Sequence, residues 1–553
     1  MKIHSLAAAA AVVLLSAPGL AAVRFDWFEY SGRDAIFAEP LPAGDYRNPV
    51  LAGFHPDPSV CRVGDDYYLV NSTFAYFPGI PVFHSRDLVH WAPIGHVISR
   101  PAQVKFDGLG INGGVFAPDL SHHRDTFYLL NTLVGAGGNC VFTAKDPAGP
   151  WTDPVFLDFD GIDPSLYFDD DGRAWLVNNG PPEGKPLYSG HRAIWIQEFD
   201  AAAKRLVGPR RVIVNGGVDP ATKPIWIEGP HLLKKDGWYF LYCAEGGTGM
   251  QHSEVVLRSR SVTGPFEPSQ ANPILTQRDV DGTVPFAVTC TGHASMVIGP
   301  DGKWWAMFLG CRPFAGHFWT TGRETFLLPV SWTGDDWPVI LPHGRRVPYA
   351  VAAPGGAHET AAIPTTGNLT WREDFSAAVL GSEWLMLRQP HETWWKTGAS
   401  SGHLELQPRT ESLGGTGNPT FLGRRVQHAR FSAAAAMEVP AETGVTAGLA
   451  MFQSESHYYA FGIRREGGLR AVIEEANGQP ARVVAQAELP DTKSLELRLM
   501  ENDREITFAV RTREGEWQQV GQVFDAVPVT VQAAGDGNHF TGAVVGPFAR
   551  LDH

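Results

Sequence analysis

The first 350 residues repeat one pattern of polar and hydrophobic positions five times. Each copy is a polar turn followed by a run of aromatic and aliphatic residues, which is typical of a β-strand. When the copies are aligned on one aromatic residue each, the spacings are 60, 47, 65 and 65 residues. The copies are "GDDYYLV" (64–70), "RDTFYLL" (124–130), "DGRAWLV" (171–177), "DGWYFLY" (236–242) and "DGKWWAM" (301–307). The repeat predicts an all-β fold over residues 45–350, a five-bladed β-propeller with about four strands in each blade.

A different pattern follows the repeats. Residues 351–368 are rich in Gly, Pro, Thr and Ala without hydrophobic periodicity, which predicts a linker. Beyond the linker, "SLELRLM" (494–500) and "REITFAVR" (504–511) alternate apolar and polar positions around a short polar turn. Such alternation is typical of strands in a half-buried sheet, and "VTAGLAMFQSESHYYAFGIRR" (445–465) adds two more strands. Residues 369–553 are therefore predicted to form a β-sandwich of concanavalin A-like or jelly-roll type.

The N-terminal stretch has the pattern of a secretory signal peptide. Lys2 supplies the positive end, residues 6–15 an apolar core, and the small residues around 19–22 a cleavage site. The apolar run is too short to span a bilayer; a membrane anchor or a misplaced start site is the alternative. Residues 1–22 are therefore predicted to export the protein to the periplasm or the medium. No other segment of the sequence has the length and hydrophobicity of a membrane span.

Charge and cysteine content narrow the range of partners. The formal net charge of −14 disfavours nucleic acid, whose phosphates would repel the protein, and suits a small neutral ligand. The cysteines are odd in number and widely spaced, at Cys61, Cys140, Cys243, Cys290 and Cys311. This is not the pattern of a disulfide framework or a zinc site, so we expect buried thiols. A single disulfide bond is the alternative. The sequence gives no indication of an oligomeric state.

The repeats share a second feature, an ionisable residue placed 11 or 12 positions before the aromatic residue. Asp57, Asp163, Glu228 and His293 occupy this position in four copies, and Ala117 occupies it in the other. Equivalent positions at the start of each blade lie near the propeller axis, so these side chains are expected to converge. Three carboxyl groups around one axis repel one another, which favours an active site that needs different protonation states. A metal or salt-bridge plug is the structural alternative.

Two carboxyl groups across a scissile bond are what glycoside hydrolysis requires. One donates a proton to the leaving oxygen, and the other activates water or attacks the sugar. A third acid nearby raises the pKa of the proton donor. Phe77, Phe116 and Trp226 flank the acidic segments. Such rings either stack on the apolar face of a sugar or fill the core, and the sequence leaves both roles open.

The segments that carry these residues resemble glycoside hydrolase family 43, the β-xylosidase and α-L-arabinofuranosidase group. The resemblance runs in order over roughly residues 45–350 and continues from about 370 to 553, where "WREDFS" (371–376) resembles the C-terminal domain of family-43 β-xylosidases. The matching text in the first part is "NPVLAGFHPDPSV" (48–60), "STFAYFPGIPVFHSRDL" (72–88), "GGVFAPDL" (113–120), "GIDPSLYFDDDG" (161–172), "WIEGPHLLKKDGWYFL" (226–241), "GHASMV" (292–297) and "GRETFLLPVSW" (322–332).

The resemblance implies a five-bladed propeller that hydrolyses its substrate in a single displacement with inversion. It implies that Asp57 is the general base, Glu228 the general acid, and Asp163 the group that orients the acid and adjusts its pKa. Arg323 matches an arginine that contacts the hydroxyl groups of the terminal sugar. His293 matches an axial histidine that in many relatives lies beside a bound calcium ion or water.

The same resemblance extends to the walls of the site. Phe77 and Phe116 fall where relatives line the sugar subsite with aromatic residues, although many relatives carry Trp at position 116. Trp226 and His293 are predicted as further substrate contacts. No cofactor is implied, and a structural calcium ion near His293 is the one metal that the resemblance admits. In relatives the C-terminal sandwich packs on the propeller and can send a loop toward the pocket.

The predicted function is an exo-acting glycosidase that releases terminal pentose from xylan or arabinoxylan oligosaccharides. β-Xylosidase is favoured because of the C-terminal sandwich. An α-L-arabinofuranosidase, or an enzyme with both activities, is the alternative, because the two sugars present similar hydroxyl patterns. A secreted propeller that binds sugar without turnover is the third possibility, and the presence of Asp57, Asp163 and Glu228 together argues against it.

Overall fold

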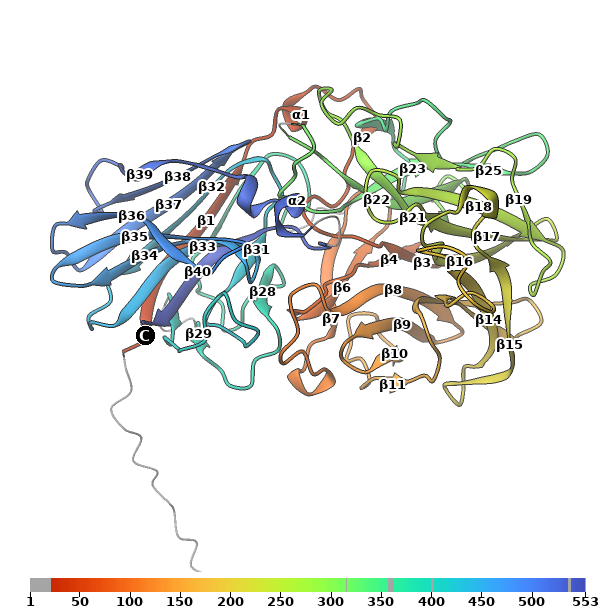
Figure 1. Cartoon of the computed structure of the whole chain (residues 1–553), viewed down its shortest axis with the longest axis horizontal. Helices are drawn as coiled ribbons and strands as arrows, with labels where there is room; N and C mark the ends of the chain where they lie inside the picture. The colour runs from red at the N-terminus through yellow and green to blue at the C-terminus, as the bar shows by residue number, and fades with distance from the viewer. Residues whose placement is uncertain (1–20, 315, 357–362, 399–401, 536–538, 553) are drawn as a thin grey trace, which may run out of the picture.

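The computed structural model describes residues 21–314, 316–356, 363–398, 402–535 and 539–552. All but the last two residues of the predicted signal peptide therefore lie outside the described residues. Figure 1 shows two lobes, each built almost wholly from strands, with the C-terminal strands and the N-terminal strand β1 in one lobe. In the described part of the chain, no helix has both the length and the apolar character of a membrane span.

The first lobe is a five-bladed β-propeller, as the repeat predicts. Each blade is an antiparallel meander, and the innermost strands of neighbouring blades contact one another around a closed ring. From the innermost strand outward, the first blade contains β3 (Ser59–Val63), β4 (Asp66–Val70), β6 (Gly79–Ser85) and β7 (Ala92–Ile98), and the second contains β8 (Gly114–His123), β9 (Thr126–Val134), β10 (Gly138–Ala144) and β11 (Val155–Phe156). The third blade contains β12 (Ile162–Phe168), β13 (Ala174–Gly180), β14 (Ala193–Asp200) and β15 (Arg205–Asn215), and the fourth contains β16 (Glu228–Lys235), β17 (Trp238–Glu245) and β18 (Ser253–Ser259), which pairs with both β19 (Glu267–Pro268) and β20 (Leu275–Thr276). The fifth blade contains β21 (Thr289–Ile298), β22 (Trp304–Cys311) and β23 (Glu324–Pro329). The repeated motifs form the second strand of each blade.

Residues before the first blade close the ring against the last blade. Leu51 forms an antiparallel bridge with Thr325 of β23, and the Val50 N–H donates to the Thr325 carbonyl oxygen at 2.9 Å. Two short pairs complete this edge, β2 (Asp45–Arg47) with β26 (Ala350–Ala352), and β24 (Ser331–Trp332) with β25 (Pro338–Val339). The first residues of the predicted linker therefore belong to a strand that pairs with the start of the propeller.

The second lobe is a sandwich of two antiparallel sheets. One sheet contains, in order, β29 (Trp395–Lys396), β30 (Leu404–Leu406), β1 (Val23–Gly32), β32 (Arg430–Glu438), β37 (Ser494–Asn502), β38 (Glu505–Arg511) and β39 (Gln518–Asp525), with β27 (Leu369–Glu373) paired to β1. The other contains, in order, β36 (Arg482–Leu489), β35 (Leu469–Asn477), β34 (His457–Arg465), β33 (Val445–Ser454), β40 (Val544–Leu551), β31 (Gly423–Arg425), β28 (Trp384–Leu387) and β5 (Tyr76–Phe77). The helices are single turns, α1 (Ala35–Ala38), α2 (Val531–Ala534), and the 3₁₀ turns η1 (Pro101–Gln103), η2 (Pro220–Thr222) and η3 (Val527–Val529).

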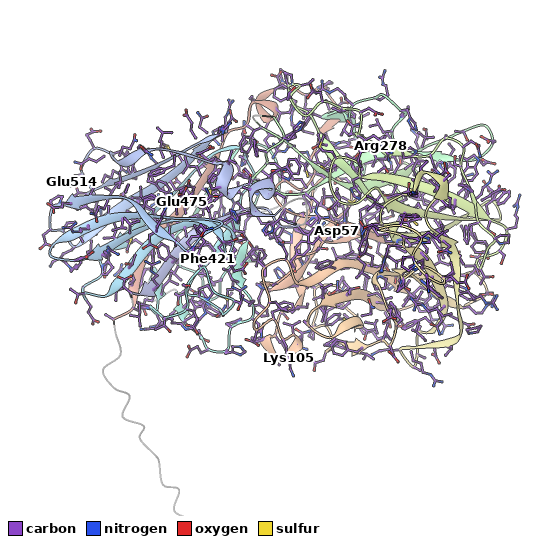
Figure 2. All side chains as sticks on the ribbon, in the orientation of Figure 1. Asp57, Lys105, Arg278, Phe421, Glu475 and Glu514 are labelled. Atoms are coloured by element: carbon purple, nitrogen blue, oxygen red, sulfur yellow. The ribbon has the colours of Figure 1, made fainter. Side chains whose placement is uncertain are left out.

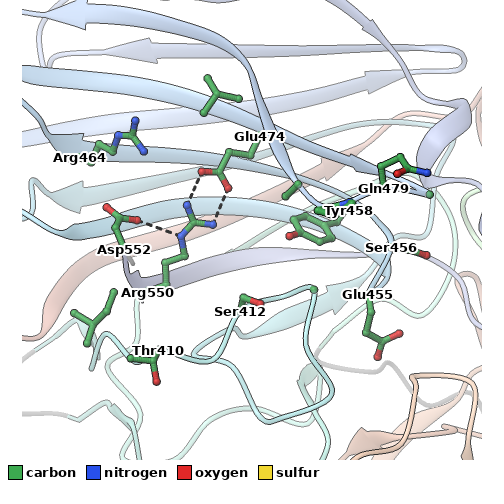
Figure 3. Close-up of a pocket in the computed structure, with 16 residues that line it drawn as sticks. Thr410, Ser412, Glu455, Ser456, Tyr458, Arg464, Glu474, Gln479, Arg550 and Asp552 are labelled. Atoms are coloured by element: carbon green, nitrogen blue, oxygen red, sulfur yellow. Dashed lines mark hydrogen bonds and ion pairs between the residues drawn. The ribbon is translucent and has the colours of Figure 1, made fainter.

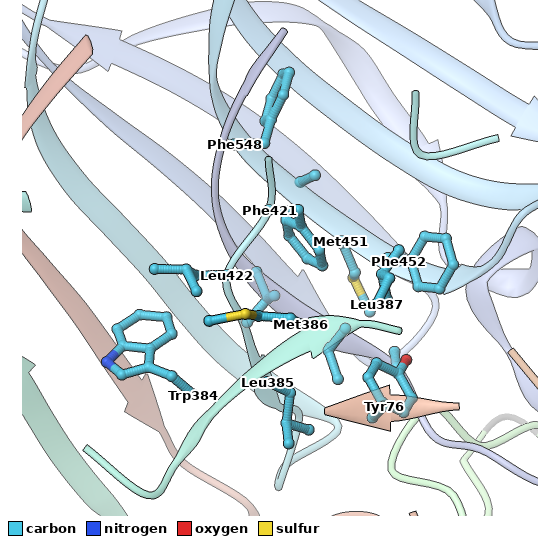
Figure 4. Close-up of a cluster of buried hydrophobic side chains, with 14 of the residues drawn as sticks. Tyr76, Trp384, Leu385, Met386, Leu387, Phe421, Leu422, Met451, Phe452 and Phe548 are labelled. Carbon is cyan, nitrogen blue, oxygen red and sulfur yellow. The ribbon is translucent and has the colours of Figure 1, made fainter. Parts of the chain in front are cut away.

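Two strands cross between the lobes. β1 precedes the whole propeller in sequence, yet it lies inside the sandwich between β30 and β32 and buries Phe28 and Tyr30 there. β5 comes from a loop of the first blade and pairs with β28 at the edge of the other sheet. Figure 4 shows Tyr76 of β5 among the apolar side chains of the sandwich. The sandwich is therefore complete only with a strand that precedes the propeller in sequence, β1, and a strand from within it, β5.

A buried ion-pair cluster joins the same two lobes. Arg312 Nη1 lies 2.7 Å from Asp34 Oδ2, and Arg312 Nε lies 2.6 Å from Glu324 Oε2. The Nη2 group of Arg312 also donates to the carbonyl oxygen of Gln427, at 2.8 Å. Asp34 follows β1 and Gln427 follows β31, so one guanidinium of the propeller contacts two segments that leave the sandwich sheets.

Replacing the guanidinium tests how much this cluster stabilises the molecule. Arg312→Met preserves volume but leaves two buried carboxylates without their cation, and we expect the free energy of unfolding to fall by about 3–5 kcal/mol. Chemical denaturation and scanning calorimetry would measure the loss. Arg372→Met is the control, because it removes the half-exposed partner of Glu29 and should cost less than about 1 kcal/mol. Equal losses in the two variants would contradict this account.

Candidate active site

The ionisable positions of the repeat lie where the inner strands are irregular. β12, β16 and β21 each have a register shift at the residue concerned. Asp57, Asp163 and His293 all have φ of 53°, and Gly229, directly after Glu228, has φ of 55°. Residues other than glycine rarely adopt this left-handed conformation, and bulges change the direction in which a side chain points. The local backbone therefore turns all four side chains out of their blades and into one cavity.

This cavity has a volume of about 380 Å³ and lies in the propeller, where Figure 2 shows Asp57. It brings together the predicted Asp57, Asp163, Glu228, His293 and Arg323. The remaining lining residues are Phe74, Phe116, Ala117, Ile162, Ile225, Trp226, Gly246, Gly247, Thr248, Gly249 and Phe540. The convergence that the spacing of the repeats predicts is therefore present in the structure.

Asp57 is held by a cation and a hydroxyl group. Arg323 Nη1 lies 3.0 Å from Asp57 Oδ1, and the Ser72 hydroxyl donates to Oδ2 at 2.6 Å. Burial alone would raise the pKa of Asp57, but Arg323, His293 and Ser72 outweigh burial and lower it. Asp57 is therefore a carboxylate at neutral pH, with its two oxygens fixed in direction.

Glu228 has the opposite protonation state. Its carboxyl group is buried, and burial followed by the nearby charge of Asp163 raises its pKa to about 8. His293 and Arg323 lower this value in part. At neutral pH Glu228 therefore carries a proton. One cavity therefore holds both an ionised acid and a protonated acid, which is the condition for general acid–base catalysis.

His293 and Asp163 contact each other in the same cavity and affect the charges of the two acids. Asp163 Oδ2 lies 3.6 Å from His293 Nε2 and accepts a hydrogen bond from the Gly229 N–H at 3.2 Å. Burial lowers the pKa of His293, but contact with Asp163 and the charge of Asp57 outweigh burial and raise it to about 9. His293 is therefore a cation at neutral pH. Together with Arg323 it balances the charges of Asp57 and Asp163 while Glu228 stays neutral.

One wall of the cavity is aromatic and includes a residue of the sandwich. The Phe540 ring stacks on Phe74 with centroids 5.7 Å apart and meets Phe116 edge-on at 5.5 Å. The Phe540 N–H donates to Asn112 Oδ1 at 3.1 Å, and its carbonyl oxygen accepts from Arg323 Nη2 at 3.5 Å. The sandwich therefore contributes directly to the site through a residue that sequence analysis did not single out.

The prediction that Phe77 lines the site is corrected to Phe74. Phe77 belongs to β5, pairs with Met386 of β28 and is buried in the sandwich core. Phe74, three residues earlier, lines the cavity in a left-handed conformation with φ of 52°. The stretch "STFAYFPG" contains three aromatic residues, and no sequence pattern distinguishes the ring that faces the cavity. Phe116 lies at the cavity, as predicted.

Trp226 lies at the rim of the cavity with 36% of its surface exposed. The guanidinium of Arg192 lies 4.7 Å from its ring centroid. Arg192 is held in turn by Asn179, whose Oδ1 accepts from Nε at 3.0 Å and from Nη2 at 2.8 Å. One face of the indole is therefore covered by a fixed cation, which holds the ring in place beside the acids.

The part of the chain that the structure describes shows no calcium site beside His293. Calcium takes six to eight oxygen ligands, and among the described residues no group of three or more His, Cys, Asp or Glu side chains is placed to hold a metal. The small cavity beneath Asp57, Asp163 and His293 measures only about 10 Å³. In the ranges that the structure describes, His293 contacts Asp163 instead. All five cysteines are buried free thiols.

A larger cavity of about 720 Å³ lies in the sandwich, on the sheet that contains β34 and β40 (Figure 3). Its charged groups pair with each other: Arg550 Nη1 lies 2.7 Å from Glu474 Oε2, and Arg550 Nε lies 3.4 Å from Asp552 Oδ1. Glu455 is paired with Arg388 at 2.7 Å. Mutually neutralised groups do not provide an acid and a base, so the chemistry belongs to the smaller cavity.

The proton on Glu228 should be visible in the stability of the protein. The pKa of Glu228 is raised from 4.5 to about 8 on folding, so its contribution to stability is full below about pH 4.5 and is lost as pH rises through 8. Glu228→Gln removes this loss, and its melting temperature should therefore rise relative to wild type between about pH 5 and pH 9. Scanning calorimetry across this range gives the difference. The exposed Glu514→Gln control should show a constant difference, and a constant difference for Glu228→Gln would refute the assigned protonation.

Two family models match the chain. The model described as glycosyl hydrolases family 43 matches residues 46–338, and the model described as beta xylosidase C-terminal concanavalin A-like domain matches residues 372–552. The two matched ranges correspond to the propeller and the sandwich. Both predicted resemblances are thus confirmed.

Similar proteins span nearly the whole chain. A xylosidase/arabinosidase of Butyrivibrio fibrisolvens is 36% identical over 510 residues, which cover 91% of this chain and 95% of the relative. A non-reducing end alpha-L-arabinofuranosidase of Bacteroides ovatus is 36% identical over 479 residues, covering 84% and 85%. The crystal structure of a GH43_12 protein retrieved from a capybara gut metagenome is 38% identical, with a TM-score of 0.89 and coverage of 96% and 100%. The chain therefore belongs to glycosyl hydrolase family 43.

Proposed function

We propose that this glycoside hydrolase releases single terminal pentose units from xylan or arabinoxylan oligosaccharides, with inversion at the anomeric carbon and with β-xylosidase as its main activity. One observation carries the proposal: a single cavity holds an ionised acid, Asp57, and a protonated acid, Glu228, at the same neutral pH. Inverting hydrolysis requires such a pair, one on each side of the scissile bond.

Asp57 acts as the general base in this proposal. It accepts a proton from the water that attacks the anomeric carbon, while Arg323 and Ser72 keep its carboxylate in place. Glu228 donates its proton to the glycosidic oxygen as the bond between that oxygen and the anomeric carbon breaks, so the leaving group departs as a neutral alcohol. After turnover Asp57 carries the proton and Glu228 is ionised, and proton exchange with solvent restores both groups.

The walls of the cavity support attack at the end of a chain. Phe74, Phe116 and Phe540 pack against one another and close one side of the cavity. A terminal sugar can place its apolar face against such rings, and the exposed Trp226 at the rim is suited to the next unit. A polymer passing through the site would need both ends open, so the aromatic wall favours exo-acting hydrolysis.

A second activity, α-L-arabinofuranosidase, is favoured by the names of the similar proteins. The Butyrivibrio protein is named for both sugars, and the Bacteroides protein is named for arabinofuranose alone. The match of residues 372–552 to the β-xylosidase C-terminal domain supports xylose as the preferred sugar. We further propose that the N-terminal 22 residues direct export, on the strength of their sequence pattern.

Substrates with different leaving groups separate the two acids. On nitrophenyl β-xyloside and α-L-arabinofuranoside, Asp57→Asn should lose about 10²–10⁴-fold in kcat. Glu228→Gln should lose about as much on xylo-oligosaccharides but much less on nitrophenyl substrates, because nitrophenolate leaves without a proton. Proton NMR of the first-formed sugar should show the inverted anomer. Equal losses of Glu228→Gln on both kinds of substrate, or a first-formed sugar that retains the anomeric configuration, would refute the assignment. If the wild-type protein released neither sugar, a sugar-binding protein without turnover would be favoured.

The contribution of the sandwich can be measured at Phe540. Phe540→Ala removes the ring that packs on Phe74 and Phe116, and we expect kcat/KM for oligosaccharides to fall about 10- to 100-fold, as the loss of about 1.4–2.7 kcal/mol of packing and sugar contact. Phe156→Ala, at an exposed site on β11, is the matched control and should leave kcat/KM unchanged. Unchanged kinetics in Phe540→Ala would show that the sandwich does not contribute to substrate binding.

A further inference from the structure

A small cavity lies between the two lobes, apart from the catalytic cavity, and its lining combines charged side chains with apolar ones such as Pro81, Phe83 and Ile363. It has a volume of about 70 Å³ and is lined by Arg424 and Arg425 of β31, by Gln427, and by His55 and Glu383, among others. Arg424 and Arg425 are 3% and 7% exposed. Two adjacent guanidinium groups are thus withdrawn from water in a space far smaller than a sugar-binding site.

Only some of the guanidinium N–H groups of these two arginines have a hydrogen-bond partner among the described residues. Arg424 Nη2 donates to Gln427 Oε1 at 2.7 Å, and Arg425 Nε donates to the Phe54 carbonyl oxygen at 2.9 Å. Arg424 Nε, Arg424 Nη1 and Arg425 Nη2 are buried and have no hydrogen-bond partner among the described residues. Native proteins rarely leave buried donors unpaired, and each such group costs about 1–3 kcal/mol, more when charged.

The described residues that line this cavity also carry more positive than negative charge. Among the described residues that line the cavity, Glu383 is the only acidic one, and burial raises its pKa, which disfavours its ionised form. Glu383 Oε2 itself has no hydrogen-bond partner among the described residues. Burial and the neighbouring charge of Arg424, offset in part by Tyr76, lower the pKa of Arg425 to about 10, so Arg425 is a cation at neutral pH. Burial also lowers the pKa of Arg424, but arginine is effectively always protonated in proteins. The described lining therefore carries excess positive charge and more donors than acceptors.

We propose that this cavity binds a small inorganic anion, with chloride as the probe that represents the class. A guanidinium N–H can only donate, so its missing partner must accept. Water accepts but brings two hydrogens that need acceptors of their own, whereas a halide accepts from several donors and neutralises charge. One water needs roughly 10–15 Å³ of cavity, so 70 Å³ accommodates a halide together with water.

The anion would stabilise the segment that carries Asp57. Arg425 Nε holds the carbonyl oxygen of Phe54, and the next residue, His55, donates its N–H to the Arg323 carbonyl oxygen at 2.9 Å. His55 also lines the cavity, and its Nδ1 has no hydrogen-bond partner in the described part of the chain. Binding between Arg424, Arg425 and His55 would therefore join the sandwich to the loop behind the catalytic site.

Melting temperature at constant ionic strength tests the proposal in solution. When chloride replaces gluconate, which is too bulky for the cavity, wild type should gain about 1–3 °C for each tenfold rise in chloride beyond the dissociation constant. Arg424→Met should lose this dependence, and Arg372→Met, at a half-exposed arginine of the same lobe, should keep it. The same dependence in wild type and Arg424→Met would overturn the proposal.

Crystals of the wild-type protein grown in bromide test it directly, even where Arg424→Met does not fold. An anomalous peak within hydrogen-bonding distance of Arg424 and Arg425 is the expected result. A cavity that contains only water overturns the proposal. So does a bromide peak without a chloride-dependent melting temperature, because that combination means binding at crystal concentration only. Neither measurement uses catalytic activity, so the outcome is independent of the proposed hydrolysis.

Discussion

Repulsion among three carboxyl groups on one axis is the constraint on which the active site depends. Asp57, Asp163 and Glu228 cannot all be ionised in a buried cavity without a large cost in free energy. Arg323 and His293 provide two positive charges, which balance two of the acids. The third acid, Glu228, then lowers the free energy by keeping its proton. Burial and the charge balance together thus make one acid a proton acceptor and another a proton donor.

The groups on the propeller axis also depend on contacts from the sandwich. The cations and rings that organise the axis are themselves positioned from the sandwich side: Phe540 contacts Arg323 and Phe74, and Arg425 holds the backbone beside Asp57. β1 precedes the propeller in sequence and β5 lies within it, but both pair within the sandwich sheets, so the hydrophobic packing is continuous between the two lobes. A loose sandwich would let the aromatic wall and the loop carrying Asp57 move independently of the acids.

The repeat in the sequence predicts the blades and the acids together, because both follow the same period. Asp57, Asp163, Glu228 and His293 occur at one position of that period, and any closed ring brings such positions to its axis. The misassignment of Phe77 for Phe74 has a different origin, since the two rings differ in backbone conformation rather than in type. Phe540 and β1 were beyond reach because their contacts join residues separated by hundreds of positions. A local pattern predicts which element forms, but not which distant element covers it.

The two buried charge clusters differ in how they reach neutrality. On the propeller axis, four charged groups compensate one another within the chain, and a movable proton on Glu228 supplies the remaining adjustment. Between the lobes, Arg424 and Arg425 meet one acid whose own burial opposes ionisation, and arginine cannot release its proton at neutral pH. Proton transfer adjusts the first cluster, which suits catalysis. The second cluster has no proton to give up at neutral pH, and this is the reason for proposing that a bound anion neutralises it.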